Sequence, residues 1–432
     1  MSLSKAIEYY KVKDYSSAAQ SYRAVYIINK DEIDLSNRIK FATSLRKCGN
    51  SKEALEICRE TYKINSKSDA LKNVYAWCIY DLEIKKQFDD IEPEMLFKAA
   101  KAIVSMVKQE TFSPYEKTVW KVINYLKDKP NFNGEEVLYW LDKLNENYLS
   151  TESFTIKDAE QKDRELASPK EKWYFLKSKA LEHLKKYNQC LELIKEINRQ
   201  DIKFHGESET WIKVRKAKCY YFLGNLEEAK KEFEGILKLK KHWSISYDLA
   251  KINYELKDMD KALLYCYDAV LDRTDYTLKV NVFEYMAKLI ILNNNIDNNL
   301  NIGREHLLLS YLIRKEKNWK VNKELGDKFN EDDTVQNLNS QLVLNGLRKF
   351  WQVEKKKTLP KFEGEVKKIL HNGASGFIMG KNGEKHFFRY NSFYGKKELI
   401  HIGLKVEFYV SESYDVKKGM DSTEAVYIKP VY

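Results

Sequence analysis

The positions of proline and glycine constrain the fold of this chain more than any other feature of its sequence. No proline occurs between residues 170 and 359, so that stretch can form nearly continuous helices joined by short turns. Eight of the sixteen glycines instead lie in residues 361–432, where Val, Phe, Tyr and Ile alternate with polar residues. The pattern predicts a mostly helical protein whose composition changes class at about Pro360, which we interpret as a domain boundary.

Composition and charge exclude several classes of protein. The chain has 432 residues, of which 43% are hydrophobic and 32% are charged, so collagen-like, mucin-like and disordered classes are excluded and several cores can form. Because the charge is mixed throughout, the net charge of +11 alone says little about nucleic acid. One helix or linker before the glycine-rich region is more basic, and we expect it to contact phosphate through Arg348, Lys349, Lys355, Lys356, Lys357 and Lys361.

The sequence contains neither a long apolar segment nor a recognisable catalytic motif. It has no signal peptide and no run of 18 apolar residues, so we expect a cytoplasmic protein with no membrane partner. Phosphate-loop, Gly-x-Ser-x-Gly and His-Glu-x-x-His motifs are missing, and we therefore expect no enzyme activity, catalytic residue or cofactor. The cysteines form no Cys-x-x-Cys pair and predict reduced, buried helix residues rather than disulfides or a metal site: Cys48, Cys58, Cys78, Cys190, Cys219 and Cys266.

A helical unit recurs five times before residue 280. In each copy a polar turn is followed by a small residue that lets two helices approach, and four residues later by an apolar or aromatic residue on the same face. The small residues are Ala18, Ala54, Cys190, Ala229 and Ala262. This unit resembles the tetratricopeptide repeat (TPR), a helix pair of about 34 residues, and residues 208–241 match best. The resemblance implies an α-solenoid whose groove binds a protein partner, which the sequence does not identify.

We divide the chain into five parts on this basis. TPR-like repeats occupy residues 1–83 and 168–330, and residues 84–167 between them read as diverged helical pairs that continue the solenoid. Residues 331–359 contain a final helix, expected over 333–357, and the basic linker. Residues 360–432 form a separate β domain.

The last part reads as five short strands separated by glycine-containing turns, which suits a small closed β-barrel. Their order resembles the cold-shock domain, an oligonucleotide-binding (OB-fold) barrel. The matching segments are Gly364-x-Val-Lys367, Gly376-Phe377-Ile378, the Phe-rich segment 386–390, Gly403-x-Lys-Val406-x-Phe408, Lys417-Lys-Gly419 and Ala425-x-x-Ile428. The resemblance implies binding of single-stranded nucleic acid through bases stacked on outward aromatic rings with basic residues around them. It does not choose between RNA and DNA, and we prefer RNA.

Two positions depart from the cold-shock pattern, since Lys368 replaces a surface Trp and Ser375 replaces a Phe. The loss of these two aromatic rings removes about 2 to 6 kcal/mol of base stacking. The strand at 386–390 has two possible registers. Phe387 and Arg389 point outward in the first, and Phe388 and Tyr390 point outward in the second. We prefer the first, because the second buries the Arg389 guanidinium. The candidate nucleic-acid-binding residues are Lys367, Lys368, Phe377, Lys381, Phe387, Phe388, Arg389 and Tyr390.

The sequence as a whole predicts a non-enzymatic adaptor that couples protein binding by the repeats to nucleic-acid binding by the barrel. The alternative is a pure protein–protein interaction scaffold whose barrel has lost nucleic-acid binding. Such a scaffold would be an accessory subunit of a larger complex, and the domain pairing alone suggests a bacterial defence or conflict system.

Overall fold

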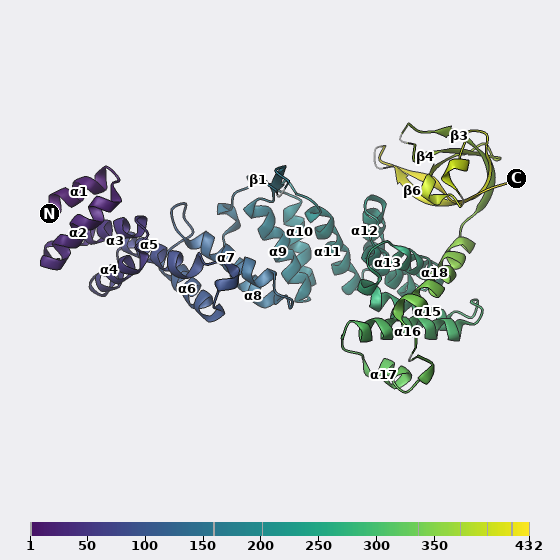
Figure 1. Cartoon of the computed structure of the whole chain (residues 1–432), viewed down its shortest axis with the longest axis horizontal. Helices are drawn as coiled ribbons and strands as arrows, with labels where there is room; N and C mark the ends of the chain where they lie inside the picture. Colours follow the sequence, from purple (N-terminus) through teal and green to yellow (C-terminus); the bar gives the residue numbers. More distant parts are fainter. Residues whose placement is uncertain are drawn as a thin grey trace. The chain divides into compact units, whose positions relative to one another are not determined.

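The computed structural model describes residues 2–158, 160–200, 202–335, 337–371, 373–394, 396–415 and 418–431. Lys417, part of the predicted cold-shock pattern, lies outside these residues. The chain divides into two compact units, Met1–Ile212 and Lys213–Tyr432 (Figure 1). The boundary between the two units falls in helix α11 (Ser208–Phe222), inside the predicted solenoid.

The first unit consists of helix pairs and one small hairpin. Its helices are α1 (Leu3–Lys11), α2 (Tyr15–Ile28), α3 (Leu35–Lys47), α4 (Ser51–Ile64), α5 (Asp69–Ile79), α6 (Pro93–Met106), α7 (Tyr115–Lys127), α8 (Gly134–Leu141), α9 (Pro169–His183) and α10 (Tyr187–Ile197). The hairpin of β1 (Phe154–Lys157) and β2 (Asp163–Leu166) corrects the prediction that residues 84–167 are helical throughout. Its residues are mostly exposed, and the alternation in the sequence is short, because β1 (Phe-Thr-Ile-Lys) has only four residues and β2 (Asp-Arg-Glu-Leu) is mostly charged.

The second unit contains further helices and the β-barrel. The helices are α12 (Leu226–Leu239), α13 (Trp243–Glu255), α14 (Met259–Leu271), α15 (Val280–Leu292), α16 (Asn299–Glu316), α17 (Lys323–Phe329) and α18 (Ser340–Lys357). The last helix therefore begins at Ser340 and not at residue 333, because the Asn339 side chain caps it by accepting from the backbone N–H of Leu342. Short helical turns are η1 (Lys30–Glu32), η2 (Tyr80–Ile84), η3 (Phe88–Asp90), η4 (Glu146–Tyr148), η5 (Tyr276–Lys279), η6 (Asp333–Val335), η7 (Tyr390–Ser392) and η8 (Lys397–Leu399).

The small residues of the repeats lie where the predicted helix pairs meet. All five are completely buried: Ala18, Ala54, Cys190, Ala229 and Ala262. The turn before each one contains a residue in the left-handed region, and this residue directly precedes the N-cap residue of the next helix: Lys13, Gly49, Lys185, Gly224 and Lys257. The helix pairs are therefore closed by the same αL turn each time. Of the cysteines, Cys48 is exposed, which corrects the prediction that all are buried.

Helix α18 is packed into the core of the second unit through its apolar stripe, Leu344, Leu347 and Trp351. The Trp351 ring stacks on Phe283 of α15, with ring centroids 5.8 Å apart and an interplanar angle of 6°. Its Nε1–H donates to Nε2 of the buried His306 on α16 at 2.8 Å. This helix thus extends the helical core to the start of the barrel, and only the segment 358–360 separates α18 from the first barrel strand.

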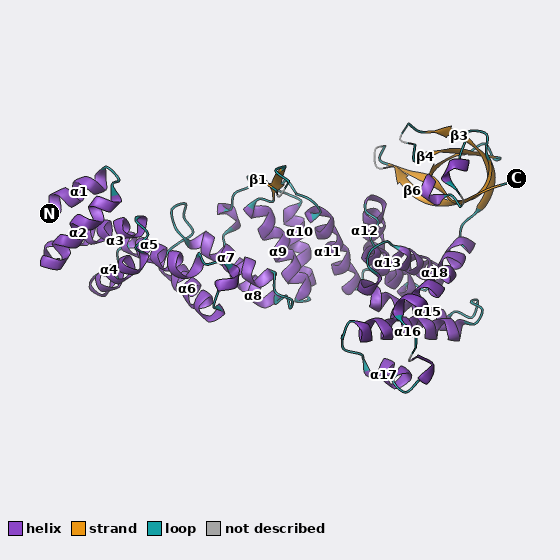
Figure 2. Ribbon diagram, viewed as in Figure 1, coloured by secondary structure: helices purple, strands orange, loops and turns teal. Residues whose placement is uncertain are grey.

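Five strands close into a barrel at the C-terminal end of the second unit, as predicted (Figures 1 and 2). They are β3 (Lys361–Ile369), β4 (Ser375–Gly380), β5 (Lys385–Arg389), β6 (Lys405–Asp415) and β7 (Met420–Pro430), in the order β3-β4-β5-β7-β6. The β5–β7 pair is parallel and the other pairs are antiparallel. The inward residues form one core that contains Val366, Ile378, Phe388, Val406, Phe408, Ala425 and Ile428. The chain is therefore a series of helical repeats followed by a closed five-stranded β-barrel.

Candidate nucleic-acid interface

Two phenylalanines form an aromatic pair on the outer side of the barrel. Phe377 on β4 and Phe387 on β5 are direct partners in the antiparallel register, so their side chains lie on the same side of the sheet. Their rings meet edge to face, with centroids 5.7 Å apart and an interplanar angle of 68°. Both rings are partly exposed, whereas their neighbours Ile378 and Phe388 are fully buried in the core. The alternation of the strands thus separates an outer aromatic pair from the inner core.

The structure has the preferred register at residues 386–390. Phe387 and Arg389 point outward, and the Arg389 side chain is 66% exposed. Phe388 and Tyr390, two of the candidate residues, do not belong to this face. Phe388 is completely buried, and the Tyr390 ring stacks on it at 5.9 Å and packs against the barrel core. The opposite register would place the Arg389 guanidinium in that core, at a large desolvation cost.

Cations surround the aromatic pair. Lys385 Nζ lies 4.2 Å from the centroid of Phe377, and Arg389 Cζ lies 5.9 Å from that of Phe387. Lys368 on β3 is the register partner of Phe377, at a bulge in the β3–β4 ladder. Sequence reasoning identified Lys368 and Arg389 but missed Lys385, whose position over Phe377 depends on how β4 and β5 are paired. We call Phe377, Phe387, Lys368, Lys385 and Arg389 the aromatic–basic face.

Acidic residues offset part of the positive charge near this face. Glu424 on β7 is mostly buried, and its Oε1 lies 3.5 Å from Arg389 Nε. The candidate Lys367 donates to Glu365 at 2.8 Å. The candidate Lys381 donates to Glu363, and this hydrogen bond lowers the pKa of the Glu363 carboxyl. Lys367 and Lys381 are exposed but already paired, so both are weaker candidates than Lys385.

Gly376 allows the strands beneath the aromatic pair to approach closely. A Cβ at this position would lie 2.4 Å from the carbonyl oxygen of Lys368 and 2.7 Å from the Phe388 ring, and real contacts are never that short. Any larger residue would therefore push β3 away from β4 or displace Phe388. Because Phe377 is the next residue, Gly376 fixes the position of the aromatic pair relative to Lys368.

The basic segment is the end of α18 with the start of β3, and three of its six cations, Lys355, Lys357 and Lys361, are paired with carboxylates. Its contact with phosphate stays a prediction. Lys355 donates to Asp268 on α14, and Lys357 donates to Glu354 at 2.6 Å. Lys356 Nζ lies 4.5 Å from the ring centroid of Tyr409, and Lys361 Nζ lies 2.7 Å from Glu407. Arg348 and Lys349 are exposed on α18. Lys355 and Lys356 connect the end of α18 to α14 and β6, and a count of charges in the sequence could not show these contacts.

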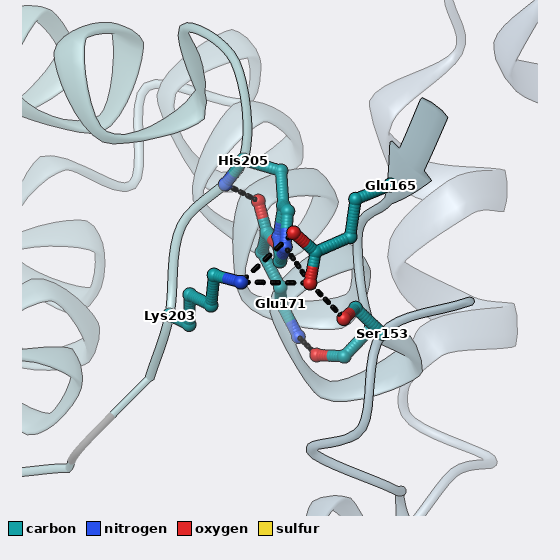
Figure 3. Close-up of polar contacts among 6 residues, drawn as sticks. Ser153, Glu165, Glu171, Lys203 and His205 are labelled. Carbon is teal, nitrogen blue, oxygen red and sulfur yellow. Dashed lines mark hydrogen bonds and ion pairs between the residues drawn. The ribbon is translucent and has the colours of Figure 1, made fainter. Parts of the chain in front are cut away.

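A separate polar cluster holds the β1–β2 hairpin in the first unit (Figure 3). The buried Glu171 of α9 accepts the backbone N–H of His205 at 2.8 Å, and its other oxygen lies 2.6 Å from His205 Nδ1. On β2, Glu165 accepts from Lys203 at 2.7 Å and lies 3.3 Å from His205 Nε2. The hydrogen bonds from Lys203, Ser153 and His205 lower the pKa of Glu165 to about 2, and the bond to Glu171 raises the pKa of His205. The cluster therefore favours an imidazolium between two carboxylates. Sequence reasoning missed it because Glu171 and His205 are far apart in the chain.

Among the residues that the structure describes, no group of three or more His, Cys, Asp or Glu side chains is placed to hold a metal ion. None of the described helices has both the length and the apolar composition needed to cross a bilayer.

Comparison with known proteins gives likeness of fold only. No protein-family model matches the chain, and no curated protein matches it. A structure of Naa15/Naa10 bound to HypK-THB is 14% identical, over 77% of this chain and 42% of that chain, with a TM-score of 0.40. A human IFIT1 dimer with PPP-AAAA is 14% identical, over 82% of this chain and 80% of that chain, with a TM-score of 0.34. A tetratricopeptide repeat protein from Parabacteroides merdae is 13% identical, over 81% and 97% of the two chains, with a TM-score of 0.26. This chain thus spans about two fifths of the first of these chains, and its structural neighbours are TPR proteins and IFIT1.

Proposed function

We propose that this protein is a non-enzymatic adaptor whose barrel binds single-stranded nucleic acid, RNA in preference to DNA, on the aromatic–basic face. The observation that carries the proposal is the Phe377–Phe387 pair with Lys368, Lys385 and Arg389 around it. Bases without a pairing partner stack on aromatic rings, and the cations attract the phosphates between them. Arg389 adds a planar, permanently charged group that can stack on a base.

The topology of the barrel supports the same proposal. Its strands are ordered β3-β4-β5-β7-β6 with the third and fifth strands parallel, which supports our proposal of an OB-type barrel of the cold-shock kind. Such barrels bind oligonucleotides on the face formed by their second and third strands. In this chain those strands are β4 and β5, which carry Phe377 and Phe387.

The helical repeats have a separate role in the proposed adaptor. Repeats of this kind bury one face of each helix against the neighbouring helices, and their remaining concave face commonly binds a peptide or protein. We propose that the repeats recruit a protein partner while the barrel holds the nucleic acid. Neither role needs a reacting group.

The proposal is tested by binding of the full chain to a labelled single-stranded RNA of about 12 nucleotides at low salt, measured by fluorescence anisotropy. Changing Phe377→Ala together with Phe387→Ala removes the stacking surface. We expect this double variant to bind at least about tenfold more weakly, since each stacked base contributes about 1 to 3 kcal/mol.

Phe112→Ala is the matched control, because this Phe side chain is 82% exposed and lies in the helical repeats. We expect it to leave the affinity unchanged. The absence of any binding of RNA or DNA by the unaltered chain would refute the proposal and favour the pure interaction scaffold. Equal binding by the unaltered chain and the double variant would refute the assignment of the face.

A further inference from the structure

A cavity of about 230 Å³ lies between the end of α18 and the barrel, away from the aromatic pair. Its lining comes from three places in the second unit: the end of α18 with the following segment, the turn after β5, and the adjoining parts of β6 and β7. The lining residues are Lys355, Leu359, Asn391, Ser392, Phe393, Tyr394, Ser411, Val426 and Tyr427. The cavity is somewhat smaller than the roughly 300 to 1,000 Å³ of drug-sized pockets, so it suits a single ring system.

Tyr427 in the cavity wall has a backbone conformation that a tyrosine seldom adopts, with φ of +53°. The cause is a bulge in the β6–β7 ladder. Tyr409 pairs with Val426 and Glu407 pairs with Lys429, so two residues of β7 lie opposite one residue of β6. Glycine is the usual residue at a left-handed bulge position, because it has no Cβ. Strain of this kind concentrates at binding sites, where it fixes the direction of one side chain.

The bulge directs the Tyr427 ring against a second tyrosine. The rings of Tyr427 and Tyr394 are nearly parallel, with centroids 6.1 Å apart and an interplanar angle of 17°. Tyr409 meets Tyr427 edge-on at 6.3 Å. Tyr394 is nevertheless 45% exposed, so part of an immobilised aromatic surface is open to a ligand. A flat ring can extend this stack at little entropic cost, because the tyrosines are already ordered.

Polar and basic groups surround the same cavity. The Asn391 side-chain oxygen accepts from Lys397 at 3.0 Å, which leaves its amide group as the donor toward a ligand. The Ser411 hydroxyl also lines the cavity. Lys429 Nζ lies 5.8 Å from the Tyr394 centroid. Burial opposes the charge of Lys355, but the nearby Asp268 outweighs this effect and raises the pKa of Lys355. An aromatic wall with amide and hydroxyl groups suits a flat heterocycle, and exposed lysines beside it suit an attached anion.

We propose that this cavity binds a nucleobase carrying a phosphate, with the base against Tyr394 and Tyr427 and the phosphate near Lys397 and Lys429. The base belongs either to a free nucleotide or to one end of a bound strand, and both sources present the same chemistry. The free-nucleotide case stands apart from the function proposed for the aromatic–basic face, whereas the strand case rests on that function.

Calorimetric titration of the full chain with adenosine 5′-monophosphate tests the free-nucleotide source. We expect saturable binding that weakens at least tenfold in Tyr427→Asn, because asparagine tolerates the left-handed conformation but removes the ring. Asn391→Ala changes an exposed residue outside the barrel core, so its folding is not at risk, and we expect the same direction of change. Phe112→Ala, which changes an exposed residue of the first unit outside both proposed sites, serves as the control and is expected to bind the nucleotide unchanged.

Ultraviolet crosslinking of a single-stranded RNA that contains 4-thiouridine tests the strand source. Crosslinks mapped to residues 391–394 and 426–427, and reduced in Asn391→Ala, support a base supplied by the strand. Nucleotide binding that is unaffected by both cavity variants would overturn the proposal. The proposal would also fail if adenosine 5′-monophosphate did not bind and no RNA crosslink appeared at these residues, even where the RNA binds elsewhere on the barrel.

Discussion

The turns between repeat helices show how single residues set the geometry of this protein. Each of the five turns places a residue in the left-handed region directly before the N-cap residue of the next helix, with φ between 58° and 84°. Two of these residues are Gly49 and Gly224, but the other three are lysines, for which this conformation costs about 1 kcal/mol. The turn is therefore required by the packing of the two helices, since it persists where the residue itself disfavours it.

Two Gly→Ala changes in the second unit should have opposite effects on the melting temperature. Gly224 has φ of +82° and Gly346 lies within α18, and an added Cβ meets no atom within 4 Å at either position. Gly224→Ala should lower the melting temperature, at a cost of about 1 kcal/mol from backbone strain. Gly346→Ala should raise it slightly, because alanine stabilises a helix by about 1 kcal/mol relative to glycine. Thermal melts of both variants check this, and a shift of the same sign in both would contradict it.

Residue-level prediction from sequence succeeded where alternation and charge agreed. Phe387 and Arg389 could be placed outside because the other register would bury a guanidinium. Lys385 could not be placed, since its contact with Phe377 depends on the pairing of β4 and β5. The left-handed conformation of Tyr427 could not be predicted either, because no neighbouring residue in the sequence indicates that this tyrosine occupies a position suited to glycine.

At the scale of elements, helices and strands with a strong hydrophobic periodicity could be predicted, whereas short exposed strands and ion pairs between distant helices could not. The buried small residues identified the repeat helices, and the glycines with alternating apolar residues identified the barrel. The β1–β2 hairpin was missed because its short strands are mostly exposed. The pairing of Lys355 at the end of α18 could not be predicted, because its partner Asp268 lies on another helix.

The attachment of α18 depends on a buried histidine, and this predicts how stability changes with pH. Burial lowers the pKa of His306 to about 4, while Nδ1 bonds the Ile302 carbonyl at 2.7 Å and Nε2 accepts from Trp351. The unfolded chain binds a proton at this residue near pH 6.5 and the folded chain does not, so stability falls as pH drops from about 6.5 toward 4. The slope from this residue is about 1.4 kcal/mol per pH unit. His306→Gln should flatten the dependence of melting temperature on pH in this range.

Trp351→Phe is the control for the His306 prediction. It keeps an aromatic ring against Phe283 but removes the hydrogen-bond donor, so the variant should be less stable at every pH. His306 still titrates in it, and the acid-side slope should remain. An unchanged slope in His306→Gln would show that other groups control the acid sensitivity.

At the scale of the whole molecule, the net charge of +11 is the excess of 75 Lys and Arg over 64 Asp and Glu, and several of these cations are paired with a carboxylate. In the first unit, for example, Arg46 Nη1 lies 3.0 Å from Asp81, and in the second unit Arg314 Nη2 lies 3.0 Å from Glu284. Such pairs contribute little attraction for a polyanion at physiological ionic strength, because each cation is screened by its own partner and by salt. The salt dependence of nucleic-acid binding should therefore reflect the aromatic–basic face and not the total charge.

The affinity for RNA should fall only gradually as the salt concentration rises, because few cations are expected to contact phosphates. Each phosphate neutralised on a single strand contributes about −0.7 to the slope of log K against log salt concentration. Lys368 and Lys385 should together give a slope of about −1.4, because Arg389 is already paired with Glu424, whereas a slope set by the net charge would be about −8. Lys385→Gln should make the slope shallower by about 0.7, and Lys381→Gln should not, because Lys381 is already paired with Glu363. Anisotropy titrations of the full chain at several salt concentrations measure all three values, and equal slopes in the two variants would show that phosphate contacts lie elsewhere.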